Sequence, residues 1–524
     1  MFHSYFSTFH QVLLGISVVL LVASGCLFFL KRYKLALMLL ILAAIPLKYF
    51  IISVDGFVNA WDESFHALVA KNMANFPLKP MLYKNPLIGY DFTSWTANHI
   101  WLHKQPLFLW QSAICIKIFG ANEIAYRLPT FVLSILFIPV LYRMGVLLVS
   151  KATGYIAALF FVLSFFVNNL TSGRYPLAEN DVIFMIYIGA SCWAYLEYLH
   201  SQKKHWLIWI GVFAGFAVLT KWVVGLLVYS TWGANLLLDY RKSKSDFFKS
   251  FIPLLKSLGI SLLLFIPWTL YTFIRFPQEA KYEFALNARH FTQVIESHAG
   301  NWKFHFDMMN QIYAPFNYYI ILPILFIGIF LILKRSGRIS ISLWIVLPLL
   351  FYSLAKTKMQ SFTIIIFPFV VLMMGAVFEM LYLKIKEKMG YGISLMLAIY
   401  AFLLLGYNVF NVDQMQFEHS TQYLGNLPRF ERIHNKQEYP KLQAAMQAPI
   451  ENTALFNVPF PYNIDMMFYT DINAYNIIPS SEQIWNLNKR GYVLYVLNKS
   501  LPDSILNNNN IIKISSGLQS DHSW

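Results

Sequence analysis

Hydrophobic runs alternate with short polar connections along the first 411 residues of the chain. A helix needs about 20 apolar residues to cross a membrane, so each run predicts one spanning helix. We expect twelve spans, at residues 11–30, 35–53, 127–148, 153–169, 180–199, 206–219, 222–238, 253–274, 317–333, 340–355, 361–383 and 391–411. Only Thr220 and Lys221 separate the two short runs at 206–219 and 222–238. The pattern predicts a polytopic α-helical membrane protein.

The composition supports this fold class. Of the 524 residues, 57% are hydrophobic and 13% are charged. A soluble domain is usually about 25% charged, so these values exclude a disordered chain and argue against a soluble enzyme. No basic segment precedes the first apolar run, and we expect this run to remain as a span rather than to be cleaved as a signal.

The loop charges predict an orientation. With the N-terminus outside, the inward connections carry 17 positive residues. The short outward connections carry four, which are Arg174, Lys221, Lys356 and Lys358. Because positive residues collect on the cytoplasmic side, two long connections, 54–126 and 275–316, and the tail 412–524 are expected outside. The basic excess belongs to the membrane part, and we expect no nucleic-acid partner.

The tail differs from the rest of the chain in composition. It is rich in Asn, Gln and Pro, and its charges are mixed. Leu455–Val458 and Tyr492–Leu497 predict short strands, and Asn507–Asn510 predicts a loop. We expect a membrane domain at 1–411, with interfacial helices in its 54–126 loop, and a small soluble α/β domain at 412–524.

Candidate chemistry begins directly after the second span, at Asp62 and Glu63. Phe65, Leu68 and Met73 follow at helical spacing and predict an amphipathic helix along the membrane surface. One interpretation makes Asp62 only the N-cap and Glu63 a first-turn acid. In the other, a carboxylate at the bilayer edge serves as a general base.

Lys104 lies just before Pro106, and Pro106 can open a second interfacial helix. The lysine is either an interface residue with a buried stem or a phosphate ligand at a helix start. The outward connections hold further charges, which are Arg174, Glu179, Lys221, Lys356 and Lys358. One such residue alone is usually a membrane anchor, but several converging at one face suggest an anionic substrate.

Six short motifs occur in a fixed order over roughly residues 50–380. They are Asp62-Glu63, then His103-Lys104-Gln105-Pro106-Leu107, then Phe119-Gly120-Ala121-Asn122-Glu123 with Arg127-Leu128-Pro129, then Arg174 with Glu179, then Leu219-Thr220-Lys221, and Ser353-Leu354-Ala355-Lys356-Thr357-Lys358 leading into Phe367-Pro368. Their content and order resemble the GT-C membrane glycosyltransferases. The closest likeness is to the protein O-mannosyltransferase and lipid A aminoarabinose transferase group.

The resemblance implies an enzyme of a bacterial-type inner membrane that takes a sugar from a polyprenyl-phosphate donor. The acceptor would be a lipid, a glycan or a protein, the active site would face outward, and the reaction would invert the sugar. Asp62 then matches the catalytic aspartate, with Glu63 beside it, and Lys104 and Arg174 match phosphate-handling positions. Glu179, Lys221, Lys356 and Lys358 complete the substrate-binding set.

Three departures from the family pattern concern the ligands. His103 replaces a glutamate, Gln105 replaces a proline, and Glu179 replaces an aspartate. Some relatives bind a metal through that glutamate and a later histidine. A divalent metal is therefore left open, with His103 and His290 as candidate ligands, and no other cofactor is expected.

Two other functional classes fit a polytopic membrane protein. A transporter or flippase for a lipid-linked sugar would place charges near the middle of spans and would show paired broken helices. The charges here lie at loop edges instead, which favours an enzyme. A polymerase or ligase for surface polysaccharide shares the lipid-linked donor, and composition does not separate it from the first hypothesis.

Overall fold

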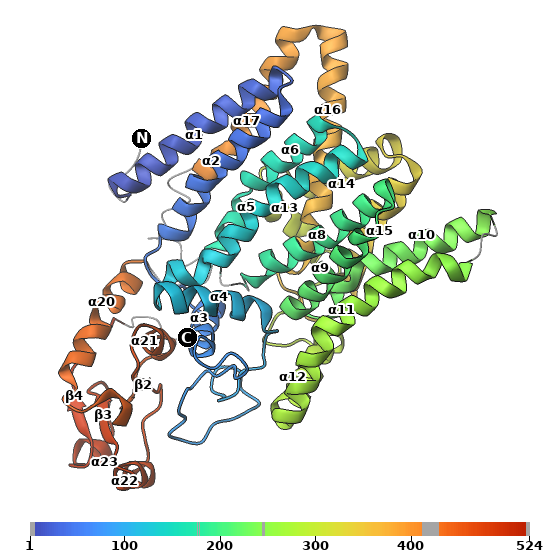
Figure 1. The fold of residues 1–524 in the computed structure, drawn as a ribbon. Coiled ribbons are helices and arrows are strands. Elements are labelled where there is room, and N and C mark those ends of the chain that lie inside the picture. The colour runs from blue at the N-terminus through green and yellow to red at the C-terminus, as the bar shows by residue number, and fades with distance from the viewer. Residues whose placement is uncertain (1–5, 176, 178, 244–246, 411–428, 520–524) are drawn as a thin grey trace.

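A computed structural model describes residues 6–175, 177, 179–243, 247–410 and 429–519. Most of the chain is helical, and a small parallel sheet lies near its C-terminus (Figure 1). The helices before residue 411 are α1 (Thr8–Phe29), α2 (Tyr33–Ser53), α3 (Asp62–Met73), α4 (Leu107–Phe119), α5 (Glu123–Leu148), α6 (Lys151–Val162), α7 (Phe165–Thr171), α8 (Asn180–Ser201), α9 (His205–Lys221), η1 (Val223–Leu226), α10 (Leu227–Ser243), α11 (Phe247–Arg275), α12 (Pro277–Thr292), α13 (Phe304–Ile312), α14 (Tyr318–Ile327), η2 (Gly328–Ile332), α15 (Arg335–Leu354), η3 (Phe362–Ile366), α16 (Phe367–Met389) and α17 (Tyr391–Phe410).

The predicted spans coincide with helices. Among the described residues, seven helical units are long and apolar enough to cross a membrane, namely α1, α2, α5, α8, α11, α15 and the unit of η3 with α16. Helices α6 and α7 form a further candidate that bends by 50°. Shorter apolar units match the remaining expected spans, and they are α9, η1 with α10, α14 with η2, and α17. The polytopic helical fold is confirmed.

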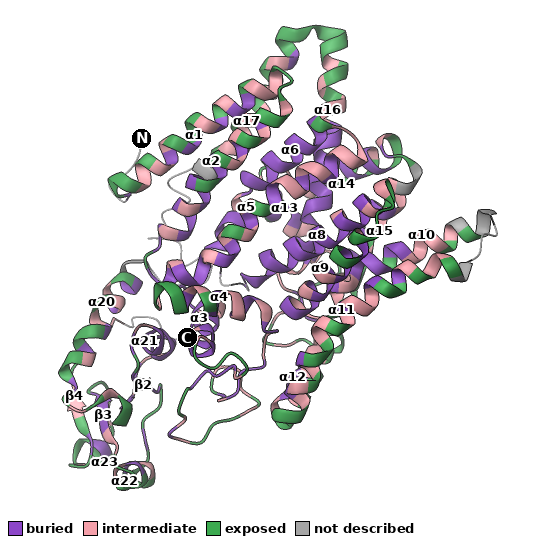
Figure 2. Cartoon of the chain, viewed as in Figure 1, coloured by how far each residue is buried: buried purple, intermediate pink, exposed green. Residues whose placement is uncertain are grey.

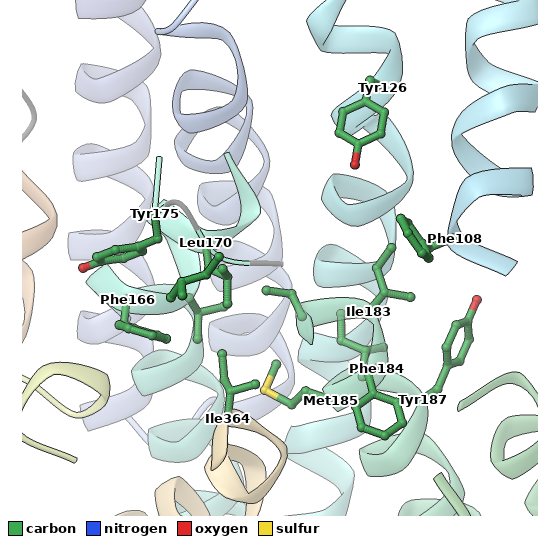
Figure 3. Packing of buried hydrophobic residues seen from close by; sticks show 14 of the residues in the cluster. Phe108, Tyr126, Phe166, Leu170, Tyr175, Ile183, Phe184, Met185, Tyr187 and Ile364 are labelled. Atoms are coloured by element: carbon green, nitrogen blue, oxygen red, sulfur yellow. The ribbon is translucent and has the colours of Figure 1, made fainter. Parts of the chain in front are cut away.

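The core of the bundle lies around α8 and α16. In the most apolar window of these helices, 83% and 78% of the residues are buried, against 17% in α11 (Figure 2). Figure 3 shows the packing beside α8, where Phe108, Tyr126, Phe184 and Ile364 come from four different segments. A helix buried on all sides carries apolar residues around its whole circumference, which is why α8 and α16 show no polar face.

Helices α5 and α6 cross at unusually short range. A Cβ atom on Gly145 would lie 2.3 Å from the Cα of Gly154, and one on Gly154 would lie 2.2 Å from the carbonyl oxygen of Tyr142. Both positions therefore need glycine. Small residues let membrane helices approach closely, and the gain is in dispersion contacts rather than in hydrophobic transfer.

The C-terminal unit is an α/β fold. Its elements are α20 (Arg429–Ala445), η4 (Ile450–Asn452), β1 (Thr453–Phe456), α21 (Tyr462–Tyr469), β2 (Asn473–Ala474), α22 (Ser481–Lys489), β3 (Val493–Leu497), α23 (Asp503–Leu506) and β4 (Ile512–Ile514). The strands are parallel in the order β2-β1-β3-β4. The predicted strand at 492–497 and the predicted loop at 507–510 are confirmed, and the strand predicted at 455–458 begins and ends two residues earlier. The expected domain boundary after residue 411 lies outside the described residues.

The C-terminal unit packs on the segment that carries Asp62. The ammonium of Lys71 in α3 donates to the carbonyl oxygen of Thr470 at 2.6 Å and lies 3.2 Å from Asp471. The amide of Val58 donates to the Tyr469 hydroxyl at 2.8 Å. This unit therefore lies at the same end of the bundle as α3 and α4 (Figure 1).

Helix α3 lacks the exposed polar face that an amphipathic surface helix would show, and its position along the membrane surface stays a prediction. Ten of its twelve residues are buried, because α4, α5 and α21 surround it. Polar side chains such as Glu63 and Asn72 are buried in α3, and other groups of the protein bind them. Helix α4 does begin directly after Pro106, as predicted, and it exposes Ile114 and Ile118 while burying its opposite side.

Candidate active site at one end of the helical bundle

Two strained backbone positions border the charged residues of the site. Trp61 precedes Asp62 with a φ of 64°, and Trp222 follows Lys221 with a φ of 68°. Positive φ is costly for bulky residues and persists only where the surroundings hold it. The ring of Trp61 packs against Phe460, with ring centroids 5.6 Å apart. Strain of this kind concentrates at functional sites.

Asp62 and Lys104 form the partly open front of the site. The Nζ of Lys104 lies 3.3 Å from the Oδ1 of Asp62, and each side chain is 15% exposed. Burial alone would raise the pKa of Asp62, but neighbouring cationic groups, Lys104 foremost, outweigh burial and lower this pKa to about 2. The carboxylate is thus ionised at neutral pH, and the structure brings together two residues that lie 42 positions apart.

Lys221 extends this cluster from the end of α9. Its ammonium pairs with the carboxylate of Asp181, and it lies 4.9 Å from the centre of the Phe362 ring. Burial tends to lower the pKa of Lys104, but Asp62 and then Asp181 raise it above the ordinary value. Two lysines and two carboxylates therefore form one electrostatic cluster, in which an incoming anion competes with the carboxylates for the ammonium groups.

Sequence analysis missed His66, which lies behind Asp62. Its Nε2 is 3.5 Å from the Oδ1 of Asp62, and its Nδ1 is 2.6 Å from the Oε1 of Glu179. The hydroxyl of Tyr126 donates to the same oxygen of Glu179. The sequence held one signal for His66. It lies four positions after Asp62, and residues four positions apart in a helix face the same way.

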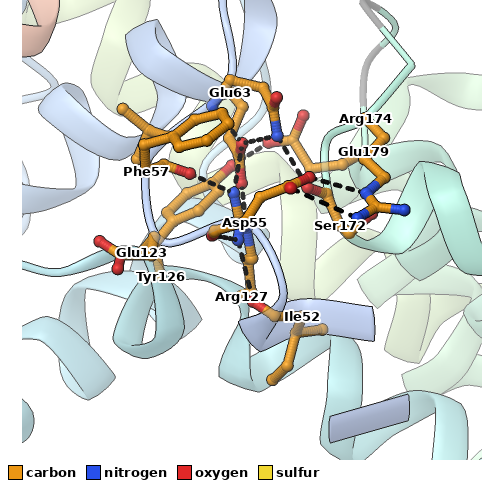
Figure 4. A network of polar contacts seen from close by, with 12 residues as sticks. Ile52, Asp55, Phe57, Glu63, Glu123, Tyr126, Arg127, Ser172, Arg174 and Glu179 are labelled. Carbon is orange, nitrogen blue, oxygen red and sulfur yellow. Dashed lines mark hydrogen bonds and ion pairs between the residues drawn. The ribbon is translucent and has the colours of Figure 1, made fainter. Parts of the chain in front are cut away.

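Glu63 lies deeper, in a network that Figure 4 shows from close by. Its carboxylate binds Arg127 through two bonds, Nε to Oε1 at 2.6 Å and Nη2 to Oε2 at 2.9 Å. The amide of Asn59 also donates to Oε2, at 2.6 Å. The guanidinium of Arg127 further donates to the carbonyl oxygens of residues 52, 55 and 57. Glu63 and Arg127 therefore hold the chain between α2 and α3 in place.

Arg174 occupies the other side of that network. Its Nε donates to the Oδ2 of Asp55 at 2.7 Å, and its Nη2 donates to Oδ1 at 3.3 Å (Figure 4). The side chains of Arg174 and Asp55 are 2% and 3% exposed. Arg174 is thus bound to a carboxylate, unlike the partly open Lys104, and its assignment as a phosphate ligand stays a prediction.

Replacing Glu63 by Gln is expected to lower the free energy of unfolding by about 3–5 kcal/mol, because a buried guanidinium would lose its counter-charge. Thermal unfolding of the detergent-purified protein measures the loss. Asp307→Asn is the matched control, since Asp307 forms an exposed pair with Lys303 at 3.9 Å and such pairs contribute little. Equal unfolding temperatures for wild type and Glu63→Gln would contradict the assigned structural role.

Lys356 and Lys358, which follow α15, have different surroundings from Lys104 and Lys221. The ammonium of Lys358 donates to the carbonyl oxygens of Tyr352, Ser353 and Ala355 at 2.9, 2.6 and 2.6 Å. It therefore caps the end of α15, which is a favourable position for a cation. Lys356 is exposed. Substrate binding by either lysine stays a prediction.

The connection that carries these lysines pairs with the end of α12. The amide of Thr357 donates to the carbonyl oxygen of His290 at 3.0 Å. Burial lowers the pKa of His290 to about 4, and the nearby charges of His103, Lys104 and Lys221 act in the same direction. The imidazole of His290 therefore borders the same cationic region as Lys104.

A pocket opens beside Lys104, between the 102–105 segment, α11 and α12. Trp268, Thr272 and Glu283 line its far side. Glu283 is buried, its Oε2 lies 3.4 Å from the Nδ1 of His103, and neither carboxylate oxygen has a hydrogen-bond partner among the described residues.

The two candidate metal ligands do not form a complete donor set. His103 pairs with Glu283, and within the described part of the chain no group of three or more His, Cys, Asp or Glu side chains could hold a metal ion. A stable site for a divalent ion usually takes three or more protein ligands.

Comparisons with known proteins identify relatives of this chain. Residues 103–271 match the model of the dolichyl-phosphate-mannose-protein mannosyltransferase family. An undecaprenyl phosphate-alpha-4-amino-4-deoxy-L-arabinose arabinosyl transferase from Pseudomonas savastanoi pv. phaseolicola is 25% identical over 359 residues, which are 65% of this chain and 61% of that protein. A protein from Aquifex aeolicus is 30% identical over 177 residues, which are 33% of this chain and 32% of its own length. The chain thus spans less than two thirds of these two relatives.

Solved structures share the fold over most of the chain. ArnT from Cupriavidus metallidurans, crystallised with undecaprenyl phosphate, superposes with a TM-score of 0.59 at 14% identity, covering 91% of this chain and 89% of ArnT. The helical bundle with its C-terminal α/β unit is therefore a GT-C fold. The resemblance of this integral membrane protein to the GT-C glycosyltransferases of the protein O-mannosyltransferase and lipid A aminoarabinose transferase group is confirmed.

Proposed function

We propose that this protein is a glycosyltransferase that moves a sugar from a polyprenyl-phosphate donor to an acceptor at the outer face of a bacterial-type inner membrane. The observation that carries the proposal is the pairing of Asp62 with Lys104. An ionised carboxylate and an ammonium lie side by side, partly open, at one end of a membrane bundle. The names of the relatives support a lipid-linked sugar as the donor.

Lys104 and Lys221 are the proposed ligands of the donor phosphate. Both are cationic groups in a site with little water, where a charge-assisted bond to phosphate is strong. The phosphate leaves with the electron pair of the broken bond to the anomeric carbon, and the two ammonium groups stabilise its developing charge.

Asp62 is the proposed general base. It accepts the proton of the acceptor hydroxyl while the acceptor oxygen bonds to the anomeric carbon. In the free protein Lys104 makes Asp62 a weak base, since it holds the pKa of Asp62 near 2. A donor phosphate on Lys104 would offset that charge and raise the pKa of Asp62. Donor binding then activates the base, and a single displacement inverts the anomeric centre.

Glu63 and Arg174 receive different roles from those that the resemblance implied. Glu63 is committed to Arg127, and Arg174 is committed to Asp55. Both pairs shape the loop and hold α3, so we assign them to positioning. Glu179 is connected to Asp62 through His66, which lies between the two carboxylates.

The orientation follows from the basic turns. The α1–α2 turn with Lys31 and the α16–α17 turn with Lys388 lie at the end of the bundle opposite α3 (Figure 1). By the positive-inside rule, this arrangement supports the proposal that these turns face the cytoplasm and that the site and the C-terminal unit lie outside. Cysteine labelling of intact cells at Asp91→Cys, in the exposed part of the 54–126 loop, should succeed with an impermeant reagent, whereas a cytoplasmic site would stay unlabelled.

The transfer itself is measured in proteoliposomes. Purified protein is incubated with radiolabelled polyprenyl-phosphate pentoses and hexoses and an extract of envelope lipids, glycans and proteins. We expect the label to move from the donor to an acceptor, with release of polyprenyl phosphate. Movement of intact donor across the bilayer without cleavage would instead establish a flippase.

A further inference from the structure

His66 lies in an enclosed position that packing alone does not require. Its side chain is fully buried in α3, one turn after Asp62. Trp101 and Phe108 contact the ring edge to face, with centroids 5.5 and 5.0 Å away. An apolar side chain would fill such a space at lower cost, because a buried polar group needs partners.

The partners of the imidazole are two carboxylates on opposite sides. The Nδ1 atom lies 2.6 Å from the Oε1 of Glu179, and Nε2 lies 3.5 Å from the Oδ1 of Asp62. Nε2 has no hydrogen-bond partner among the described residues. The short contact indicates that Nδ1 carries a proton and donates it to Glu179. In the neutral imidazole the lone pair of Nε2 then faces Asp62.

We propose that Glu179 and His66 form a proton-holding dyad behind Asp62. This inference rests on the proposed function and assigns positioning roles in that reaction. The acceptor hydroxyl gives its proton to Asp62 as its oxygen bonds to the anomeric carbon and the phosphate departs. The proton of Asp62 then moves to the Nε2 of His66, and the resulting imidazolium is stabilised by Glu179. Return of the proton to Asp62, which is partly open, and from there to water restores the neutral imidazole beside the ionised Glu179.

The surrounding charges direct the proton inward. Lys104 foremost, then His66 when it is protonated, and His103 lower the pKa of Asp62 and so disfavour a proton on this carboxylate. On the inner side, Glu179 and Glu63 lie close enough to interact, and burial raises the pKa of Glu179, so that this carboxylate attracts a proton.

The other elements packed on α3 add no cation beside the imidazole. The hydroxyl of Tyr126 in α5 donates to Glu179, and Arg127 in the same helix binds Glu63. From α21, Asp465 is paired with Arg432 at 2.8 Å. The path from Asp62 to Glu179 through His66 therefore runs from a cationic to an anionic region.

The variant His66→Gln tests whether His66 takes up a proton or only positions Asp62. A Gln amide can still hydrogen-bond to Asp62, but it cannot take up a proton. We expect kcat to fall about 10- to 100-fold with the donor KM within twofold of wild type, because removal of a proton-accepting group costs rate without loss of donor contacts. The acid limb of kcat against pH that reflects protonation of His66 should disappear in His66→Gln.

Two further variants complete the experiment. Glu179→Gln removes the charge behind His66, and kcat should fall in the same range. Asn72→Ala is the matched control in α3, because Asn72 is buried and bonds to the carbonyl oxygens of residues 81 and 82. It should lower the unfolding temperature without changing kcat or its pH profile.

The outcomes are distinguishable from failure of the proposed function. If wild-type protein transfers no sugar from any lipid-phosphate donor, the proposed function fails. If wild type is active and His66→Gln keeps the wild-type kcat and pH profile, the dyad is overturned while the proposed function stands. A fall in kcat with an unchanged acid limb also overturns proton holding and leaves His66 a packing residue.

Discussion

Asp62→Asn is expected to abolish most sugar transfer, with kcat reduced about 10²- to 10⁴-fold, the usual contribution of a general base. Asn is nearly the same size as Asp. The N-cap of α3 is Trp61 rather than Asp62, and no side chain caps this helix, so the start of α3 should survive the change. It cannot accept the proton of the acceptor hydroxyl. Steady-state transfer from the radiolabelled lipid donor measures the loss, and thermal unfolding confirms that the variant is folded.

Asp91→Asn is the control for this substitution. Asp91 lies in the same 54–126 segment, is exposed, and accepts a hydrogen bond from Thr93. Its loss should leave kcat within twofold of wild type. Near-normal turnover in a folded Asp62→Asn variant would show that Asp62 is not the base and only pairs with Lys104. Glu179, the other site carboxylate connected to His66, would then be the next candidate base.

Lys104→Ala is expected to weaken donor use about 10- to 150-fold, which corresponds to a charged hydrogen bond of roughly 1.5–3 kcal/mol. The same change removes the main cation beside Asp62. The pKa of Asp62, now about 2, should therefore rise. A carboxylate with a raised pKa becomes protonated at higher pH. The acid limb of the kcat/KM profile should therefore shift to higher pH in Lys104→Ala.

Lys117→Ala provides the comparison for Lys104→Ala. Lys117 lies in the last turn of α4 and is exposed. Its removal should change neither the donor KM nor the pH profile. If Lys104→Ala keeps both the donor affinity and the acid limb of wild type, the phosphate binds elsewhere.

The spans were predictable because each is fixed by local hydropathy. Apolar runs such as 11–30 and 180–199 need no tertiary information, since the bilayer sets the length. The surroundings of α3 were not predictable in the same way. Its apolar residues at helical spacing suited a surface helix. In the structure, α4 and the C-terminal unit, which lie far away in the sequence, cover it.

The charged residues of the site were also predictable only in part. Asp62 and Lys104 could be named from their motifs, and the structure places them 3.3 Å apart. The partners of Glu63 and Arg174 could not be named, because Arg127 and Asp55 lie 64 and 119 positions away. Whether a charged side chain forms an ion pair with an opposite charge depends on the tertiary fold.

The most direct test of the central claim is a structure of the protein with undecaprenyl phosphate bound. We predict the phosphate within about 2.7–3.2 Å of the ammonium groups of Lys104 and Lys221, the range of charged hydrogen bonds. The Lys104–Asp62 contact should lengthen as the phosphate replaces the carboxylate. A phosphate bound away from both lysines, with the Asp62–Lys104 pair intact, would contradict the proposed site.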